Sequence, residues 1–141
     1  MMDQKVREAI EQAVNSEPFA QALNLELVEL EKGHSLVSMI YEPEKMNNIY
    51  GRAHGGALFA LIDEAFETAA QTDGTVAVAL NVNVTYVSSP KPGLQLRAEA
   101  RRVSQTKKTA SYDIKVTDEN GDLIALCQAL AFDTGKPIPF L

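Results

Sequence analysis

The segment from Asn48 to Glu67 holds the residue types in this chain that could carry out acyl transfer. Gly55 and Gly56 stand at the start of an apolar stretch whose pattern predicts a helix, and the first N–H groups of a helix have no partner inside it. Such N–H groups can stabilise negative charge on a carbonyl oxygen. Asp63 lies about two turns further on, where a carboxylate is rare unless it is paired or functional. We therefore expect the Gly55 N–H to bind a carbonyl oxygen and Asp63 to act as a base or nucleophile.

Two other carboxylates compete with Asp63 for this role. Helical spacing places Glu67 on the same face as Asp63, one turn further from the helix start, and points Glu64 about 100° away, toward the surface or an interface. Glu67 ranks below Asp63 because it lies farther from the N–H groups at the helix start. Asp63 could instead only bind a backbone group or reach solvent. His54, just before the two glycines, could orient a substrate or serve only as a cap.

The composition argues for one domain that does not bind nucleic acid unaided. The 141 residues carry a net charge of −6 without a long basic block, whereas phosphate neutralisation needs clustered Lys and Arg. The N-terminus lacks a secretory pattern, and the apolar runs are too short to span a membrane. Cys127 is the only cysteine, which fits a reducing compartment. We therefore expect a cytoplasmic protein that does not enter membranes. No metal-ligand spacing or phosphate loop occurs, so we expect no metal and no cofactor.

The spacing of apolar residues predicts the elements that would position these groups. They are helices over residues 3–15, 18–23 and 55–71, and strands over residues 25–31, 36–41, 76–86, 94–103, 109–117 and 123–132. The third helix is apolar almost all round, which predicts burial. Short turns among the last four strands predict an antiparallel meander, and a helix wrapped by such a sheet gives an α+β fold. Open sheet edges favour pairing between copies, so we expect an oligomer. His34, at the turn between the first two strands, is expected to be exposed.

Four basic residues flank a turn expected near residues 104–106; they are Arg101, Arg102, Lys107 and Lys108. In an acidic protein such a patch can bind the phosphates of a ligand, or it can be an ordinary solvated turn. The pattern alone leaves both interpretations open.

The spacing around the two glycines matches a known family. The matching positions are Asn48, Gly51, His54, Gly55, Gly56 and Asp63, followed by Asn83-Val-Thr85-Tyr86 and Ser89-Pro90. From about residue 20 to residue 133, the chain resembles the hot-dog-fold acyl-CoA thioesterases of the phenylacetate-pathway (PaaI) type. The resemblance implies a long central helix wrapped by a mainly antiparallel sheet of five to six strands. We accordingly expect an N-terminal helical segment (1–23), a hot-dog domain (24–134) and an irregular tail (135–141).

The resemblance also implies roles for individual residues. Asp63 would be the nucleophile or general base, the Gly55 N–H would polarise the thioester carbonyl, Asn48 would contact water or substrate, and His54 would orient the loop or the thioester. Each site would combine residues of two subunits of a homodimer, usually paired into a tetramer. The resemblance and the side-chain types together predict further substrate or CoA contacts from Gly56, Phe59, Phe66, Leu80, Asn81, Lys107, Lys108 and Thr109.

The sequence therefore predicts a thioesterase that hydrolyses an aromatic or medium-chain acyl-CoA to the free acid and CoA. Two alternatives stay open. One is a hot-dog hydratase or dehydratase, which would change enoyl-CoA without releasing a thiol. The other is a protein that binds acyl-CoA without hydrolysing it. The identity of the acyl group and the choice between CoA and acyl carrier protein as its carrier are also open.

Overall fold

The computed structural model describes residues 1–141 and is built around helix α4 (Gly55–Ala70). Ten of its sixteen residues are buried, so the chain covers the helix on almost every side, as the apolar pattern predicts. The exposed residues recur every three or four positions and so lie on one face; they are Gly56, Phe59, Asp63 and Glu67. We refer to these four residues as the uncovered stripe of α4.

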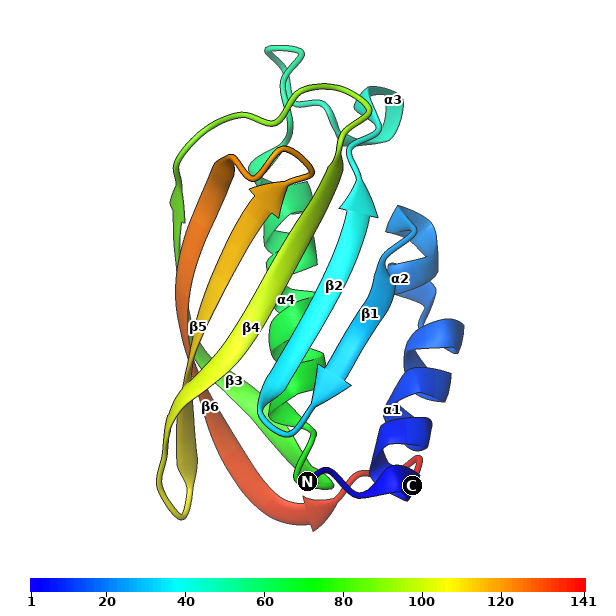
Figure 1. Ribbon diagram of the computed structural model, residues 1–141, viewed down its shortest axis with the longest axis vertical. Coiled ribbons are helices and arrows are strands. Elements are labelled where there is room, and N and C mark those ends of the chain that lie inside the picture. The colour runs from blue at the N-terminus through cyan, green and yellow to red at the C-terminus, as the bar shows by residue number, and fades with distance from the viewer.

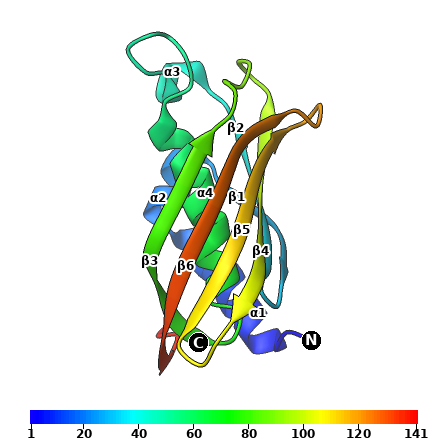
Figure 2. The same cartoon turned by 90° about the vertical axis from the view of Figure 1, so that its left-hand side faces the viewer.

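A single antiparallel sheet wraps α4 (Figure 1). Its strands are β1 (Glu26–Glu31), β2 (His34–Ile40), β3 (Thr75–Tyr86), β4 (Gln95–Gln105), β5 (Thr109–Asp118) and β6 (Leu123–Pro137). They lie in the order β1-β2-β4-β5-β6-β3, and Figure 2 shows the last four of these strands crossing in front of the helix. The α+β fold with one long helix and a sheet of six strands confirms the prediction.

The two edges of the sheet differ in how they are covered. Helix α1 packs against edge strand β1 (Figure 1), whereas nothing in the chain covers edge strand β3, which runs beside α4. Apolar side chains on β3 are correspondingly exposed: Val78 by 46%, Leu80 by 57% and Tyr86 by 49%. At Leu80 the pairing with β6 shifts by one residue, so Leu80 forms a bulge in the edge strand. A long, apolar edge of this kind is a surface for pairing with another chain.

The N-terminal segment consists of α1 (Gln4–Ser16) and α2 (Pro18–Leu23). The carboxylate of Asp3 caps α1 by accepting from the N–H groups of Lys5 and Val6. The apolar face of α1 enters the core through Val6, Ile10 and Val14, as the four-residue spacing predicts. No helix of the chain is long and apolar enough to cross a bilayer.

Two expectations about the strands were wrong. His34 lies in β2 and donates a hydrogen bond from Nε2 to the carboxylate of Glu99 on β4 at 3.2 Å, with its side chain only 15% exposed. The last strand continues to Pro137, five residues beyond the predicted end, because Pro137 pairs opposite Thr75 of β3. The N–H of Ile138 then donates to Gly74 and its side chain is buried, so the start of the expected irregular tail is ordered against the body of the protein.

Candidate active site

Asn48 shapes the loop that leads into α4. Its side-chain Oδ1 accepts hydrogen bonds from the backbone N–H of Tyr50 at 2.8 Å and of Arg52 at 3.1 Å. The N–H of His54 donates to the carbonyl oxygen of Met46 at 2.7 Å, which closes the loop where the helix begins. These bonds occupy the acceptor of Asn48, so its amide NH₂ is the group that can donate to water or to a substrate.

His54 is the N-cap of α4. Its Nδ1 accepts a hydrogen bond from the N–H of Gly56 at 2.8 Å, so the cap is a neutral imidazole that carries its proton on Nε2. A Cβ at position 56 would lie 2.9 Å from that Nδ1. Glycine at position 56 therefore lets the imidazole fold back over the helix start, and the Nε2–H stays available to a ligand.

The cap leaves one N–H free at the start of α4. The N–H groups of Ala57 and Leu58 donate to the carbonyl oxygen of His54, and Gly56 donates to its ring. No protein group accepts from the N–H of Gly55. The hydroxyl of Tyr86 on β3 donates to the carbonyl oxygen of Gly55 at 3.1 Å, which fastens this residue to the edge strand. Gly55 thus presents the open donor that the sequence predicts.

Asp63 lies on the uncovered stripe, beside a cleft of about 220 Å³ between α4 and β3. Phe66, Ala77, Val78 and Ala79 line the cleft and make it largely apolar. Partial desolvation by these neighbours, followed by the negative charge of Glu17, raises the pKa of Asp63 above its ordinary value.

One chain does not bring Asp63 and Gly55 together. Eight residues separate them on α4, and at 1.5 Å per residue this puts about 12 Å between them along the helix axis. A carbonyl bound at Gly55 is therefore out of reach of Asp63 in the same chain. The two groups can act on one carbonyl only if a second α4 lies alongside in the opposite direction.

The predicted apolar contacts occupy different places. Phe59 is 36% exposed on the stripe, whereas Phe66 is buried and packs edge-on against Tyr112 with 5.5 Å between ring centroids. Phe66 therefore serves mainly the core and contributes to one wall of the cleft. Leu80 and Asn81 are exposed on the free edge of β3.

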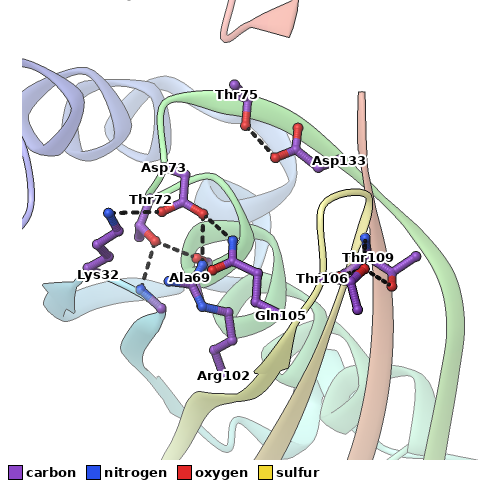
Figure 3. Close-up of polar contacts among 11 residues, drawn as sticks. Lys32, Ala69, Thr72, Asp73, Thr75, Arg102, Gln105, Thr106, Thr109 and Asp133 are labelled. Carbon is purple, nitrogen blue, oxygen red and sulfur yellow. Dashed lines mark hydrogen bonds and ion pairs between the residues drawn. The ribbon is translucent and has the colours of Figure 1, made fainter. Parts of the chain in front are cut away.

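The predicted phosphate contacts lie away from Gly55. Lys107 and Lys108 form the turn between β4 and β5, and Thr109 begins β5; this turn is at the opposite end of the molecule from the start of α4 (Figure 1). Arg102 is already engaged, because it donates to Asp73 at 2.8 Å (Figure 3). The other arginine of the patch, Arg101, pairs with Glu99. Of the four basic residues, only the two lysines lack an ion pair.

The helical spacing points Glu64 toward the surface or an interface, and the structure shows that it does not reach the surface. It is only 4% exposed, because the N-terminal segment covers that side of α4 and brings Glu17 to it. Desolvation by burial and the neighbouring Glu17 and Glu67 raise the pKa of Glu64 to about 10, and desolvation and Glu17 raise the pKa of Glu67 to about 7. Sequence reasoning missed Glu17, because 47 residues separate it from Glu64 and no local pattern links them.

Comparison with known proteins identifies the family of the chain. A family model described as "Thioesterase superfamily" matches residues 50–125, more than half of the chain. The acyl-coenzyme A thioesterase PaaI of Escherichia coli strain K12 is 29% identical over 119 residues, which cover 84% of each chain. Human acyl-coenzyme A thioesterase 13 is 30% identical over 128 residues, covering 88% of this chain and 91% of that protein.

Solved structures extend the likeness to the whole chain. The structure of the E. coli PaaI protein superposes with a TM-score of 0.91 at 27% identity, covering 98% of this chain and 99% of that one. The structure of smu.793 from Streptococcus mutans UA159, bound to acetyl CoA, has a TM-score of 0.76 at 32% identity and covers 82% of this chain and 92% of that one. The fold is therefore the hot-dog fold that the sequence motifs predict.

The family model, the relatives and the superposed structure agree: the chain belongs to the thioesterase superfamily and is a thioester hydrolase of the PaaI type.

Proposed function

We propose that this chain hydrolyses acyl-CoA thioesters with an aromatic or medium-chain acyl group, at sites shared between two copies of the chain. The proposal rests on two groups of α4, the open N–H of Gly55 at the helix start and the Asp63 carboxylate on the uncovered stripe. The relatives described as acyl-CoA thioesterases, and the relative solved with acetyl CoA, support CoA as the carrier.

Two copies related by a twofold axis would complete the site. Pairing through the free edge of β3 would bury its exposed apolar side chains and set the two uncovered stripes against each other. Each carbonyl would then lie between the Gly55 N–H of one copy and the Asp63 carboxylate of the other. A homodimer is thus the smallest active unit in this proposal, and pairing of dimers would give the tetramer.

The proposed reaction uses groups of the chain and water. The Gly55 N–H binds the carbonyl oxygen and stabilises the oxyanion that forms when the carbonyl carbon is attacked. Asp63 either attacks that carbon itself or takes a proton from the attacking water. The C–S bond then breaks, and the CoA thiolate leaves and is protonated. If water attacked, the acyl group leaves as the free acid; if Asp63 attacked, water hydrolyses the resulting acyl–Asp63 anhydride, which releases the free acid and restores the carboxylate. Two further donors lie close to Gly55 in sequence, the amide NH₂ of Asn48 and the Nε2–H of His54. Each can donate a hydrogen bond that orients the water or the thioester.

The lining of the cleft suggests the acyl group. Phe66, Ala77, Val78 and Ala79 offer an apolar surface next to Asp63, which suits an aromatic ring or an alkyl chain. We propose that Leu80 and Asn81 border the path of the pantetheine and that Lys107, Lys108 and Thr109 of another copy contact the CoA phosphates.

Release of free thiol from acyl-CoA tests the proposal. Wild type and Asp63→Asn would be compared on phenylacetyl-, benzoyl-, hexanoyl- and acetyl-CoA. We expect turnover by wild type to be highest with one of the first three and to fall by about 10²–10⁴-fold in the variant, because the base or nucleophile is lost. Melting curves would establish that Asp63→Asn is folded, and Glu29→Gln, an exposed carboxylate on β1, is the matched control.

Full activity in Asp63→Asn would move the role to Glu67 or Glu64. Acyl-CoA binding by wild type without thiol release would make the chain a binding protein, and consumption of enoyl-CoA without thiol release would make it a hydratase.

A further inference from the structure

Three carboxylates meet where the N-terminal segment touches α4. Glu17 lies at the junction of α1 and α2, and Glu64 and Glu67 lie on the facing side of α4. One carboxylate oxygen of each residue lies within 4.8 Å of those of the other two. We refer to these three residues as the glutamate cluster.

The cluster is unusual because no basic side chain of the chain pairs with it. Glu64 is 96% buried, given its exposure of 4%, and its Oε2 has no hydrogen-bond partner. The Oε1 of Glu17 is also buried without a partner. None of the six ion pairs in the structure includes a member of the cluster. Buried carboxylates persist in proteins when they are paired, protonated or bound to a cation.

We propose that Glu17, Glu64 and Glu67 form a binding site for a divalent cation of the calcium type. Three carboxylates and no nitrogen or sulfur donor make a set that hard cations prefer. Ligand distances of 2.3–2.6 Å place opposite oxygens on Ca²⁺ about 4.6–5.2 Å apart, so oxygens within 4.8 Å of one another can reach one ion with little movement. Mg²⁺, with distances of about 2.0–2.1 Å, needs them closer and dehydrates reluctantly.

Charge and access favour a metal ion over an organic cation. A divalent ion attracts the carboxylates more strongly than a single ammonium group does. Glu17, which lies outside the uncovered stripe, is only half-buried, so water can reach the cluster and complete the coordination of the ion. The cation would tie the α1–α2 junction to the helix that carries Asp63, next to an apolar cavity of about 330 Å³ that Ile10, Val14 and Ile138 help to line. This inference does not depend on the proposed function.

Calorimetry and thermal unfolding of the full chain test the site. Protein freed of metal with a chelator would be titrated with CaCl₂ at pH 8, where protons compete less for the carboxylates. We expect one ion bound per chain and a rise in Tm of roughly 5–10 °C when free Ca²⁺ exceeds its Kd a hundredfold. Glu17→Gln and Glu67→Gln, which change the two less buried ligands, should each abolish the binding heat and the rise in Tm. Glu11→Gln, an exposed glutamate on α1, should keep both.

Three outcomes would overturn the proposal. The first is the absence of both heat and a Tm shift with CaCl₂ in wild type. The second is a shift that survives in Glu17→Gln and Glu67→Gln, which would place the ion elsewhere. The third is a Tm rise with propylammonium chloride but not with CaCl₂, which would assign the cluster to an organic cation. Because the readouts are heat and Tm, failure here and failure of the thioesterase proposal are distinguishable.

Discussion

At the scale of single residues, the free N–H of Gly55 can be removed without disturbing the helix it begins. Proline is well accepted at the first position of a helix, where its missing N–H breaks no helical bond. Gly55→Pro should therefore leave a folded protein whose rate of acyl-CoA hydrolysis is lower by about 10²–10³-fold, the usual effect of losing one oxyanion donor.

Gly55→Ala is the matched control for this change. Like proline, alanine adds a Cβ at position 55, which lies 3.3 Å from the Tyr86 hydroxyl, but alanine keeps the N–H. We therefore expect Gly55→Ala to retain most of the activity. Equal rates for the alanine and proline variants, measured by thiol release, would exclude the N–H as the oxyanion donor.

Most residues of the candidate site could be placed from the sequence. The features that could not be predicted depend on other segments of the chain. Gly55, Gly56 and Asp63 could be placed because helical periodicity fixes the direction of each side chain along one element. The same periodicity gave the direction of Glu64 but not its surroundings, because burial there depends on Glu17 from a distant segment. The use of the His54 Nδ1 as the cap likewise depends on a loop whose shape the sequence does not determine.

At the scale of elements, Asp73 joins the connection between α4 and β3 to the end of β4. It accepts from Arg102 and from Gln105, each at 2.8 Å, and pairs with Lys32 at 3.6 Å (Figure 3). Partial burial alone would raise the pKa of Asp73, but the hydrogen bonds from Gln105 and Arg102 and the nearby positive charges outweigh it and lower the pKa. The network therefore stabilises the fold when Asp73 is ionised.

This network predicts a dependence of stability on pH. Because the pKa of folded Asp73 is below its ordinary value of 3.8, its contribution is complete above that value and is lost as the pH falls through the folded pKa. Asp73→Asn should lower the free energy of unfolding by about 1–3 kcal/mol at pH 7 and by less near pH 3, as measured with urea. An equal loss at both pH values would contradict the role of the charge, and Asp113→Asn, an exposed carboxylate on β5, is the control.

The elements themselves were predicted well where their pattern is local. All six strands and the three longest helices follow the expected spacing of apolar residues. The errors fall where long-range pairing decides the outcome. Residues Gly135 to Pro137 look irregular in sequence, yet they extend β6 because β3 lies beside them. His34 looks like a turn residue, yet it pairs with Glu99 because β4 is the neighbour of β2.

At the scale of the whole molecule, the proposed sharing of sites can be tested by mixing two inactive variants. In a symmetric dimer, each site would take Gly55 from one copy and Asp63 from the other. A dimer of one Asp63→Asn copy and one Gly55→Pro copy would then hold one intact site and one doubly altered site. Random mixing makes half of the dimers mixed, so activity should return to roughly a quarter of wild type.

Co-refolding the two variants and measuring thiol release would check this expectation, with each variant refolded alone as the control. Recovery no greater than the sum of the two alone would mean that the sites are not shared. A monomer by sedimentation that is fully active would contradict the composite site directly.

The cap of α4 also bears on which acyl compounds the enzyme can attack. Because the His54 ring occupies the N–H of Gly56, the helix start offers a single donor to a developing oxyanion. A thioester carbonyl is already strongly electrophilic, since sulfur donates little electron density to it, and its thiolate departs readily. Oxygen esters and amides are less electrophilic and expel poorer leaving groups, so they demand more stabilisation than one N–H supplies. The same imidazole that starts the helix would thereby restrict the reactivity of the site to thioesters.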